Sequence, residues 1–591
     1  DARRPARLGA SAAWRTPSQR PWDALSRAAS VLALWAVAAA LAATLSPTTD
    51  ATDSVEFQIV ARTLRIAHAP GYPLYTLLGH VATWLPVGDV AWRMNLLSAA
   101  FGVVAAALAL ALGRRLARNP LGGVLAALWL SWTPQLWSQA VITEVYTLHM
   151  AIVLAILVCL ACVPFTPKGV EPGTRWRGAA LVLSGLGFTH HLTTVLLYPC
   201  VALVSLLREP RLLLRPRRVA ACAAALAAGL VPLAYLPLRW RAVQGAAIDV
   251  PTFLGYVTGR NYPGLLDMGR VADEPARWVL AAHQFTTALA PAVLVAAAIG
   301  VVALARRRHA FALVLPIVVA SYGAFYLGYF AWDGWVVLLP ALGATAVLAA
   351  VGTAAVAGDV GTWRRPATAA LAALVTAAAV ARAGPQVDGS RGWSGQAEAD
   401  AALALPIPAG ARLVVEPAVG AGFLFARHLA GVRPDLDVVY ADWPAGRAAL
   451  DDPAASDRPV VAYGVPPRDA WRDRAPPRAL GPFVVLSDGA DVPEPDRAIG
   501  PGDAGAADND RDAGGDAGRN AGVALTAARA GDPPWRDDVP AVRAGDGLPI
   551  TLAWRVAHPP DDVALRVRWR PHAAPAATPA ERALPPGAVA E

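Results

Sequence analysis

The sequence predicts an all-α polytopic membrane domain with about 11 transmembrane helices, followed by a non-cytoplasmic α/β region and a β-rich tail. The first observation is composition: the 591 residues are 55% hydrophobic and only 16% charged, with a mean hydropathy of +0.40. Soluble domains carry about 25% charged residues. The second is that this shortage of charge is concentrated in residues 29–383. The third is that basic residues gather in short loops between the apolar runs.

A helix that crosses about 30 Å of hydrocarbon needs about 20 apolar residues. Residues 178–207 fit either one long tilted helix or two short ones. Residues 71–87 are apolar but interrupted by prolines and a histidine, and we expect them to form an interfacial or re-entrant helix. The predicted spans are 29–46, 94–113, 120–138, 143–163, 178–190, 192–207, 219–238, 278–304, 310–330, 335–357 and 367–383.

The basic residues set the expected orientation. With this number of spans, every loop rich in arginine or lysine falls on one side, which the positive-inside rule assigns to the cytoplasm. Residues 1–28 form a cytoplasmic N-terminal segment on that side, and residues 47–93, 239–277 and those after 384 lie on the other side. The net charge of +8 comes from these loops. We therefore expect membrane lipids, and not nucleic acid, as partners of the basic residues.

The same topology gathers ionisable residues at the outer face. Charged groups at helix ends near a membrane usually face a cavity or a partner. We therefore predict a polar site there. The alternative is that each group lies by itself in the solvated headgroup region. Asp333, the single acid of a short outer loop, is the clearest case for this alternative. The residues are Asp53, Glu56, His68, Glu144, His190, His191, Asp249 and Asp333.

The motif D-S-V-E places two acids three residues apart, Asp53 and Glu56, on one face of an expected amphipathic helix at 53–66. The structural interpretation is a capping box that starts this helix, with Thr52 or Asp53 as the cap. The functional interpretation is a carboxylate that accepts the proton of an attacking hydroxyl group in a sugar transfer. We assign both acids to catalysis, with Glu56 partly structural.

The motif H-A-P-G-Y-P at 68–73 cannot continue a helix, because it contains two prolines and a glycine. It predicts a sharp turn that presents His68 and Tyr72 beside the acids. A helix-breaking turn explains the prolines and the glycine, but it does not explain the histidine and the tyrosine. We therefore assign His68 and Tyr72 to substrate binding.

Two further motifs end at the outer face, and we assign them to substrate binding. W-S-Q-A-V-I-T-E-V-Y brings Glu144 and Tyr146 there, and T-H-H brings His190 and His191. A pair of histidines can bind a metal ion. Adjacent residues diverge on a helix, however, and no third ligand follows at a suitable spacing, so no metal is expected.

Arginines in the outer loop 239–277 run against the positive-inside trend. Guanidinium groups match phosphate oxygens, so Arg239, Arg241 and Arg260 can bind the phosphate of an anionic lipid, with Tyr262 beside them. The alternative is that these are ordinary surface arginines.

Several motifs in order resemble a known family: DATDSVEF, IAHAPGYPLYTLLG, RMNLLSAAFG, WSQAVITEVYTLH, GLGFTHHLTTVLLYP and YLPLRW. Together they are similar to the bacterial domain-of-unknown-function family 2723, which is related to the eukaryotic protein O-mannosyltransferases of the GT-C superfamily. The resemblance covers about residues 30–350. Val55 stands where the family has a glycine, Ala69 stands where it has a proline, and Asp249 is a tentative counterpart of a family acid.

The resemblance implies a GT-C-like domain at 29–383 that transfers a sugar, mannose or another hexose, from a polyprenyl-phosphate-linked donor. The acceptor would be a hydroxyl group of a protein, lipid or glycan, and the transfer would invert the anomeric centre. Asp53 would be the general base, the arginines would steady the leaving phosphate, and no metal or other cofactor would be needed. The implied location is the bacterial cytoplasmic (inner) membrane, multi-pass, with the catalytic face and the C-terminal region periplasmic.

Two other functions are also compatible with the sequence. A transporter or flippase of lipid-linked glycans would place polar residues near the middle of the membrane, whereas here they cluster at one face. A non-catalytic scaffold would leave the function to the soluble tail.

The C-terminal third has ordinary polarity. Short apolar runs alternate with a helical segment in 384–490, which predicts an α/β region. Residues 487–546 are rich in Asp, Gly, Ala and Pro, which is typical of a disordered linker. Residues 547–591 form the tail, with a β-hairpin predicted at 548–571.

Overall fold

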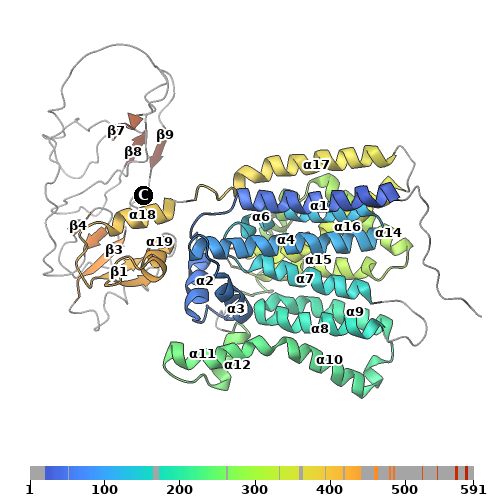
Figure 1. The fold of residues 1–591 in the computed structure, drawn as a ribbon, viewed down its shortest axis with the longest axis horizontal. Coiled ribbons are helices and arrows are strands. Elements are labelled where there is room, and N and C mark those ends of the chain that lie inside the picture. The colour runs from blue at the N-terminus through green and yellow to red at the C-terminus, as the bar shows by residue number, and fades with distance from the viewer. Residues whose placement is uncertain are drawn as a thin grey trace, which may run out of the picture. The chain divides into compact units, whose positions relative to one another are not determined.

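The structure is a computed structural model, and the chain divides into two compact units, residues 1–395 and 396–591. The first unit is helical and the second contains a small sheet (Figure 1). The described residues are 20–50, 52–163, 172–260, 264–331, 333–358, 364–392, 394–416, 420–440 and 458–463, with the strand segments 478–480, 483–485, 522–523, 542–543, 566–569 and 580–583.

The helices of the first unit follow the apolar runs of the sequence. They are α1 (Arg20–Ala43), α2 (Thr52–Thr63), α3 (Pro73–Ala82), α4 (Val90–Ala117), α5 (Pro120–Ser131), α6 (Pro134–Ala140), α7 (Tyr146–Cys162), α8 (Pro172–His190), η2 (Leu192–Leu197), α9 (Tyr198–Arg208), η3 (Leu212–Leu214), α10 (Pro216–Gly229), η4 (Val231–Ala234), α11 (Tyr235–Gln244), α12 (Val250–Val257), α13 (Ala276–Ala288), α14 (Pro291–Arg306), α15 (Phe311–Gly328), η5 (Gly334–Leu338), α16 (Leu339–Ala357) and α17 (Arg364–Val387).

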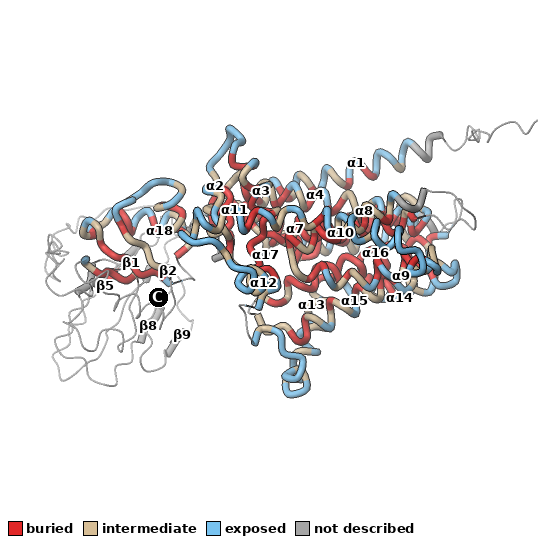
Figure 2. The backbone as a smooth tube through the Cα atoms, turned by 90° about the horizontal axis from the view of Figure 1, so that it is seen from below, coloured by how far each residue is buried: buried red, intermediate tan, exposed pale blue. Residues whose placement is uncertain are grey.

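The core of this unit surrounds α16, which is apolar on all sides and almost entirely buried. Figure 2 shows buried segments along the middle of the bundle, where α16 lies. α14 and α16 approach closely because glycines face the partner backbone. A Cβ atom at Gly300 would clash with the carbonyl of Leu348, and one at Gly352 would clash with the carbonyl of Ala296. Small residues thus allow these two helices to pack backbone against backbone.

Within the described residues, five helices are long and apolar enough to cross a membrane, or up to seven if each of two bent pairs is one span. The other predicted spans correspond to shorter or interrupted apolar helices. The count of eleven therefore stays a prediction. Residues 178–207 form two helices, since α8 ends at His190 and a 3₁₀ segment follows.

Several predicted spans differ in the structure, including the one at 219–238, which is bent by 48° between Gly229 and Val231. α1 begins at Arg20 and not at residue 29, so it takes in part of the predicted cytoplasmic segment. The span predicted at 120–138 is broken before Pro134, because proline cannot continue the hydrogen-bond ladder of α5. The span predicted at 278–304 is bent by 96° between α13 and α14, where Pro291 starts the second helix.

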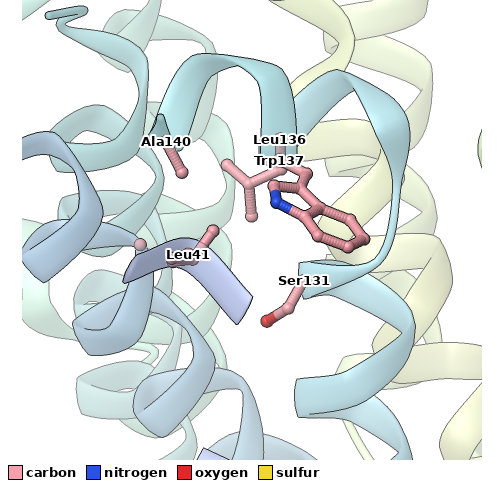
Figure 3. A pocket seen from close by; sticks show the side chains of 6 residues that line it. Leu41, Ser131, Leu136, Trp137 and Ala140 are labelled. Carbon is pink, nitrogen blue, oxygen red and sulfur yellow. The ribbon is translucent and has the colours of Figure 1, made fainter. Parts of the chain in front are cut away.

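The break between α5 and α6 borders a small pocket (Figure 3). Its lining is apolar apart from the hydroxyl group of Ser131, which has no hydrogen-bond partner among the described residues. Trp137 lines the pocket, and its Nε1 donates to Thr44 Oγ1 at 2.9 Å. The lining residues are Leu41, Gly102, Ser131, Leu136, Trp137 and Ala140.

The second unit contains a five-stranded sheet in the order β2-β1-β3-β5-β4. β1 runs parallel to β2 and β3, whereas β5 is antiparallel to β3 and β4. The elements are α18 (Ser394–Leu403), β1 (Arg412–Val415), α19 (Ala421–Phe425), the π-helical η6 (Ala426–Ala430), β2 (Asp437–Tyr440), β3 (Val460–Tyr463), β4 (Arg478–Leu480) and β5 (Phe483–Val485). Phe423 packs against the ring of Phe483 and closes the core on one side of the sheet.

Two short strand pairs follow. β6 (Gly522–Val523) pairs with β7 (Val542–Arg543), and β8 (Arg566–Trp569) pairs with β9 (Ala580–Ala583). β8 lies inside the hairpin predicted at 548–571, but its described partner follows that range. The rest of the predicted linker and tail lies outside the described residues.

The glycine packing of α14 and α16 gives a stability prediction. Gly352→Ala should destabilise the protein by about 1–3 kcal/mol, because the new methyl group meets the Ala296 carbonyl. The melting temperature in detergent measures this effect. Gly323→Ala in α15 is the control, since a Cβ atom there meets no atom within 4 Å and alanine is the better helix former. An equal loss in both variants would contradict the packing argument.

Candidate active site

A buried polar network fixes α2, the helix that carries both acids of the D-S-V-E motif. Ser54 Oγ donates to the carbonyl of Thr143 at 2.9 Å, and Gln58 Nε2 donates to Thr143 Oγ1 at 2.9 Å. Thr143 Oγ1 donates in turn to Asn95 Oδ1 at 2.5 Å. Thr143 precedes α7 and Asn95 lies in α4, so one hydroxyl group links three elements. Since buried polar groups need partners, this network sets the position of α2.

Asn95 extends the network to the segment before α2. Its Nδ2 donates to the carbonyls of Ser46 and Thr48, each at 2.9 Å. The chain between α1 and α2 is thus held against α4. The start of α2, where Asp53 lies, is fixed on both sides.

After α2 the chain forms a hook, which we define as residues 64–72. Leu64 ends the helix with φ 53°, and Gly71 and Tyr72 have φ 92° and 42°. The Gly71 N–H donates to the carbonyl of His68 at 2.7 Å. At Gly71 a Cβ atom would lie 2.7 Å from a methyl group of Leu236, so both the positive φ and the close approach require glycine. The predicted turn at 68–73 is confirmed.

Side chains of α11 and α12 hold the carbonyls of the hook. Tyr235 Oη donates to the Arg65 carbonyl at 2.8 Å, and Arg239 Nε donates to the Leu64 carbonyl at 2.9 Å. Tyr256 donates to the Ala67 carbonyl. These contacts satisfy backbone groups that the irregular hook leaves without helical partners. Arg239, predicted to bind phosphate, therefore has a positioning contact that the sequence did not indicate.

Glu56 and His68 form a two-point contact between α2 and the hook. One carboxylate oxygen accepts from the backbone N–H of His68 at 2.7 Å, and the other lies 2.6 Å from His68 Nδ1. Nδ1 therefore carries the proton, which leaves Nε2 directed elsewhere. Both oxygens of Glu56 are used in this way, so Glu56 orients His68. This geometry favours a positioning role for Glu56 over the predicted catalytic one.

Asp53 differs from Glu56 in its contacts. Its half-buried carboxylate makes no hydrogen bond to a side chain or backbone group among the described residues. Ligand atoms of Asp53, Glu56 and His68 all lie within 4.8 Å of one another. Asp53 is thus close to the Glu56–His68 pair and still able to accept a hydrogen bond. Two carboxylates and an imidazole could also hold a divalent cation, but Glu56 and His68 are already hydrogen-bonded to each other.

Burial and neighbouring charges shift the pKa values of this group. Burial raises the pKa of Asp53 above its usual value, and nearby Glu56 and Asp333 add to this while His68 opposes it. Burial alone would lower the pKa of His68, but the Glu56 hydrogen bond and the charges of Glu56, Asp53 and Asp333 outweigh it, so the net shift is upward. The site thus favours a charged His68 and a more basic Asp53.

Three more predicted residues lie in the same electrostatic cluster. Tyr146 Oη donates to Asp333 Oδ2 at 3.4 Å, which links α7 to the segment before η5. Burial raises the pKa of Asp333, against opposing contributions from its hydrogen bonds and from His68. Glu144, just before α7, lies near enough to Asp53 for the two carboxylates to interact electrostatically. The structure therefore brings Asp53, Glu144, Tyr146 and Asp333 together.

His190 and His191, the predicted T-H-H pair, contact the hook through aromatic rings. The ring centroid of Tyr72 lies 5.2 Å from that of His68 and 6.4 Å from those of both His190 and His191. His190 Nε2 lies 2.8 Å from the carbonyl of Val145, to which it donates. Tyr72 thus joins the Glu56–His68 pair to the histidines at the end of α8.

A third histidine, His149 in α7, was missed by the sequence reasoning. Its ring centroid lies 4.6 Å from that of His191, and Thr193 Oγ1 lies within hydrogen-bond distance of both, at 3.2 Å and 2.7 Å. The Nδ1 atoms of His149 and His190 are buried without a partner among the described residues. The available signal was spacing, because His149 follows Tyr146 by three residues and shares its helix face.

The remaining predicted residues lie apart from this cluster. Arg241 and Arg260 are exposed, and neither guanidinium group forms a hydrogen bond or ion pair within the described residues. Asp249 caps α12 by accepting from the Thr252 N–H at 2.7 Å, which is a structural role. Tyr262 lies outside the described residues.

Comparison with known sequences identifies the segment that contains most of these residues. Residues 53–213 match the family model described as the protein O-mannosyl-transferase TMEM260 N-terminal domain. The mouse protein named protein O-mannosyl-transferase TMEM260 is 33% identical over 247 residues, which are 40% of this chain and 34% of the mouse protein. The Dictyostelium discoideum protein of the same name is 27% identical over 106 residues, 17% of this chain and 13% of that protein. The chain thus spans about a third or less of these relatives.

Solved structures identify the fold. ArnT from Cupriavidus metallidurans in the apo state superposes with a TM-score of 0.51 at 15% identity, over 79% of this chain and 98% of ArnT. The chain therefore shares the fold of ArnT. ArnT bound to undecaprenyl phosphate gives the same TM-score at 14% identity, over 80% of this chain and 98% of ArnT. With its several apolar helices, the chain is a multi-pass membrane protein. The predicted resemblance to protein O-mannosyltransferases is confirmed at this level, whereas family 2723 and a bacterial origin stay predictions.

The Glu56–His68 pair gives a prediction about pH. The pKa of His68 is higher in the folded state, so the stability from its charged form is present below the unfolded pKa and is lost as pH rises through the folded pKa. Glu56→Gln should therefore lower the melting temperature more at pH 5.5 than at pH 9. Glu274→Gln, which removes a partly exposed acid paired with Arg270, is the control. A melting-temperature loss from Glu56→Gln that is independent of pH would contradict this assignment.

Proposed function

We propose that the chain is a GT-C-type glycosyltransferase that transfers a sugar from a polyprenyl-phosphate-linked donor to a hydroxyl group, with Asp53 as general base. The observation that carries the proposal is the placement of Asp53. Its carboxylate has no hydrogen bond to any described residue, and it lies beside an ordered Glu56–His68 pair. The names of the relatives and the undecaprenyl phosphate bound to ArnT support this class of reaction and donor.

The proposed reaction is a single displacement. The acceptor oxygen attacks the anomeric carbon and forms the new glycosidic bond while Asp53 takes the hydroxyl proton. The bond between that carbon and the phosphate oxygen breaks, and the polyprenyl phosphate leaves with the electron pair. Attack from the face opposite the leaving group inverts the anomeric centre. The raised pKa of Asp53 suits this role, because a stronger base takes the proton more readily.

His68 would interact with the charge that develops on the leaving phosphate. Glu56 holds its Nδ1, so Nε2 can point toward the substrate, and the raised pKa favours the charged form. A positive group already in place needs no reorganisation during the reaction. Arg241 and Arg260 would bind the donor phosphate as it enters, while Arg239 holds the hook.

The tyrosine and histidine cluster would form the sugar subsite. Tyr72, Tyr146 and the histidines offer ring faces, hydrogen-bond donors and acceptors in one place, which suits a sugar with several hydroxyl groups. The proposal is for mannose or another hexose, and for an acceptor on a protein, lipid or glycan. It needs no metal and no other cofactor. It places the reaction on the periplasmic face of a bacterial inner membrane, since the basic loops lie opposite.

The central test is Asp53→Asn. We expect transfer to fall by about 10²- to 10⁴-fold, the usual contribution of a positioned base, with the protein level in the membrane unchanged. Mass spectrometry of envelope proteins and lipids, in cells carrying either form, measures the sugar lost and identifies the acceptor class. Asp273→Asn, an exposed acid remote from the cluster in sequence, is the matched control. An unchanged glycan profile with Asp53→Asn present in the membrane would contradict the enzyme and favour transport.

The role of the exposed arginines gives a second test. Arg241→Gln and Arg260→Gln should each raise the KM for the lipid-linked donor about fivefold, with kcat nearly unchanged, because each removes about 1 kcal/mol of charge attraction before the chemical step. Lysine at the same positions should restore part of the affinity, since it keeps the charge and loses the two-point geometry. An unchanged KM in both glutamine variants would remove these arginines from the donor site.

A further inference from the structure

A groove between α8 and α10 lies at the other end of α8 from the histidines. The two helices run parallel and pack closely where Gly185 faces Gly229, because a Cβ atom on either would clash with the partner backbone. Nearer their N-termini they leave a groove, and a Cβ atom at Gly178 would meet no atom within 4 Å. α10 lies at the edge of the bundle beside α8 (Figure 1). The groove is lined by Arg177, Gly178, Leu181, Arg218, Ala221 and Cys222.

Three arginines surround one acid beside this groove, and two of them, Arg177 and Arg218, line it; we call this arrangement the mouth. Glu209 accepts from Arg177 at 2.9 Å, from Arg215 at 3.1 Å and from Arg218 at 2.6 Å. Arg177 is buried, with its side chain 9% exposed. Three guanidinium groups outnumber one carboxylate, so the mouth keeps a net positive charge. The acid holds the arginines in place and leaves them short of negative partners.

Two of these arginines keep donors free for a further ligand. The side chains of Arg215 and Arg218 are 50% and 45% exposed, and each guanidinium group has five N–H donors. Each uses one nitrogen for Glu209. Since both side chains are about half exposed, the remaining donors are accessible to a ligand, and they match the oxygens of a phosphate group.

Apolar side chains complete the amphipathic surface. Leu213 and Leu214, directly before Arg215, are 70% and 77% exposed. Exposed leucines beside arginines are typical of a segment at a membrane surface, where the leucines enter the acyl region and the arginines remain with the phosphates. Inside the groove Leu181, Ala221 and Cys222 offer an apolar wall below the charged mouth.

We propose that this groove binds one anionic phospholipid, with its phosphate on Arg215 and Arg218 and an acyl chain along the apolar wall. The positive-inside rule is enough to explain why this loop is rich in arginine. It does not explain arginines fixed by a shared carboxylate above an open, apolar groove between two helices. The site is separate from the proposed active site, since Arg177 and His190 lie about 20 Å apart along α8 at 1.5 Å per residue.

The test uses the full-length chain in detergent, with added phosphatidylglycerol or with phosphatidylcholine of the same acyl chains, and measures retained lipid by native mass spectrometry. Phosphatidylglycerol should be retained preferentially. Arg218→Gln and Arg215→Gln should each weaken its retention about fivefold, the effect of about 1 kcal/mol for one arginine near anionic lipid. Arg217→Gln is the matched control, because it removes the same charge from the same segment but neither contacts Glu209 nor lines the groove among the described residues.

A second variant tests the groove without changing charge. Gly178→Leu should also weaken retention, since the side chain enters open space, and it should not impair folding for the same reason. Equal effects of Arg217→Gln and Arg218→Gln would overturn the proposal in favour of diffuse surface charge. Displacement of the lipid by millimolar inorganic phosphate would overturn it in favour of a soluble phosphate ligand. Unchanged lipid retention by the Gly178→Leu variant would contradict the proposal that an acyl chain lies in the groove.

Discussion

The hydroxyl group of Thr143 is the point on which the arrangement of the site depends. This hydroxyl group accepts from Gln58 of α2 and donates to Asn95 of α4. The backbone carbonyl of Thr143 accepts from Ser54. These groups are buried, so leaving any of them without a partner would cost about 1–3 kcal/mol. The network therefore allows one placement of α2 against α4 and α7. Because Asp53 and Glu56 lie on α2, their distance from the histidines follows from this choice.

The hook shows how an irregular segment is made rigid at the same site. It cannot form helical hydrogen bonds, so its carbonyls are satisfied by Tyr235, Arg239 and Tyr256 from a region more than 160 residues later. Glu56 completes the fixation from within, through both the backbone and the ring of His68. The imidazole is thereby held in one tautomer and one orientation. Rigid support of this kind is what a preorganised charge beside a substrate requires.

α8 separates two kinds of chemistry along one helix. At its C-terminal end the buried His190 and the following His191 contact tyrosines and another histidine. At its N-terminal end Arg177 joins a cluster of permanent charge around Glu209. Glycines between these ends let α10 approach closely enough to define the groove. The proposed sugar subsite and the proposed lipid site therefore lie at opposite ends of the same helix.

The sequence by itself determined the class of the protein and most helix positions. Apolar runs, prolines and the three-residue spacing of Asp53 and Glu56 are local features of the sequence. The length of an apolar run and the period of a helix are enough to interpret them. The tertiary structure decided the partners: Glu56 with His68, His149 with His191, and Arg239 with the Leu64 carbonyl instead of a phosphate. The last two contacts join residues 42 and 175 positions apart. Local patterns do not encode such contacts, because they arise only when packing brings distant segments together.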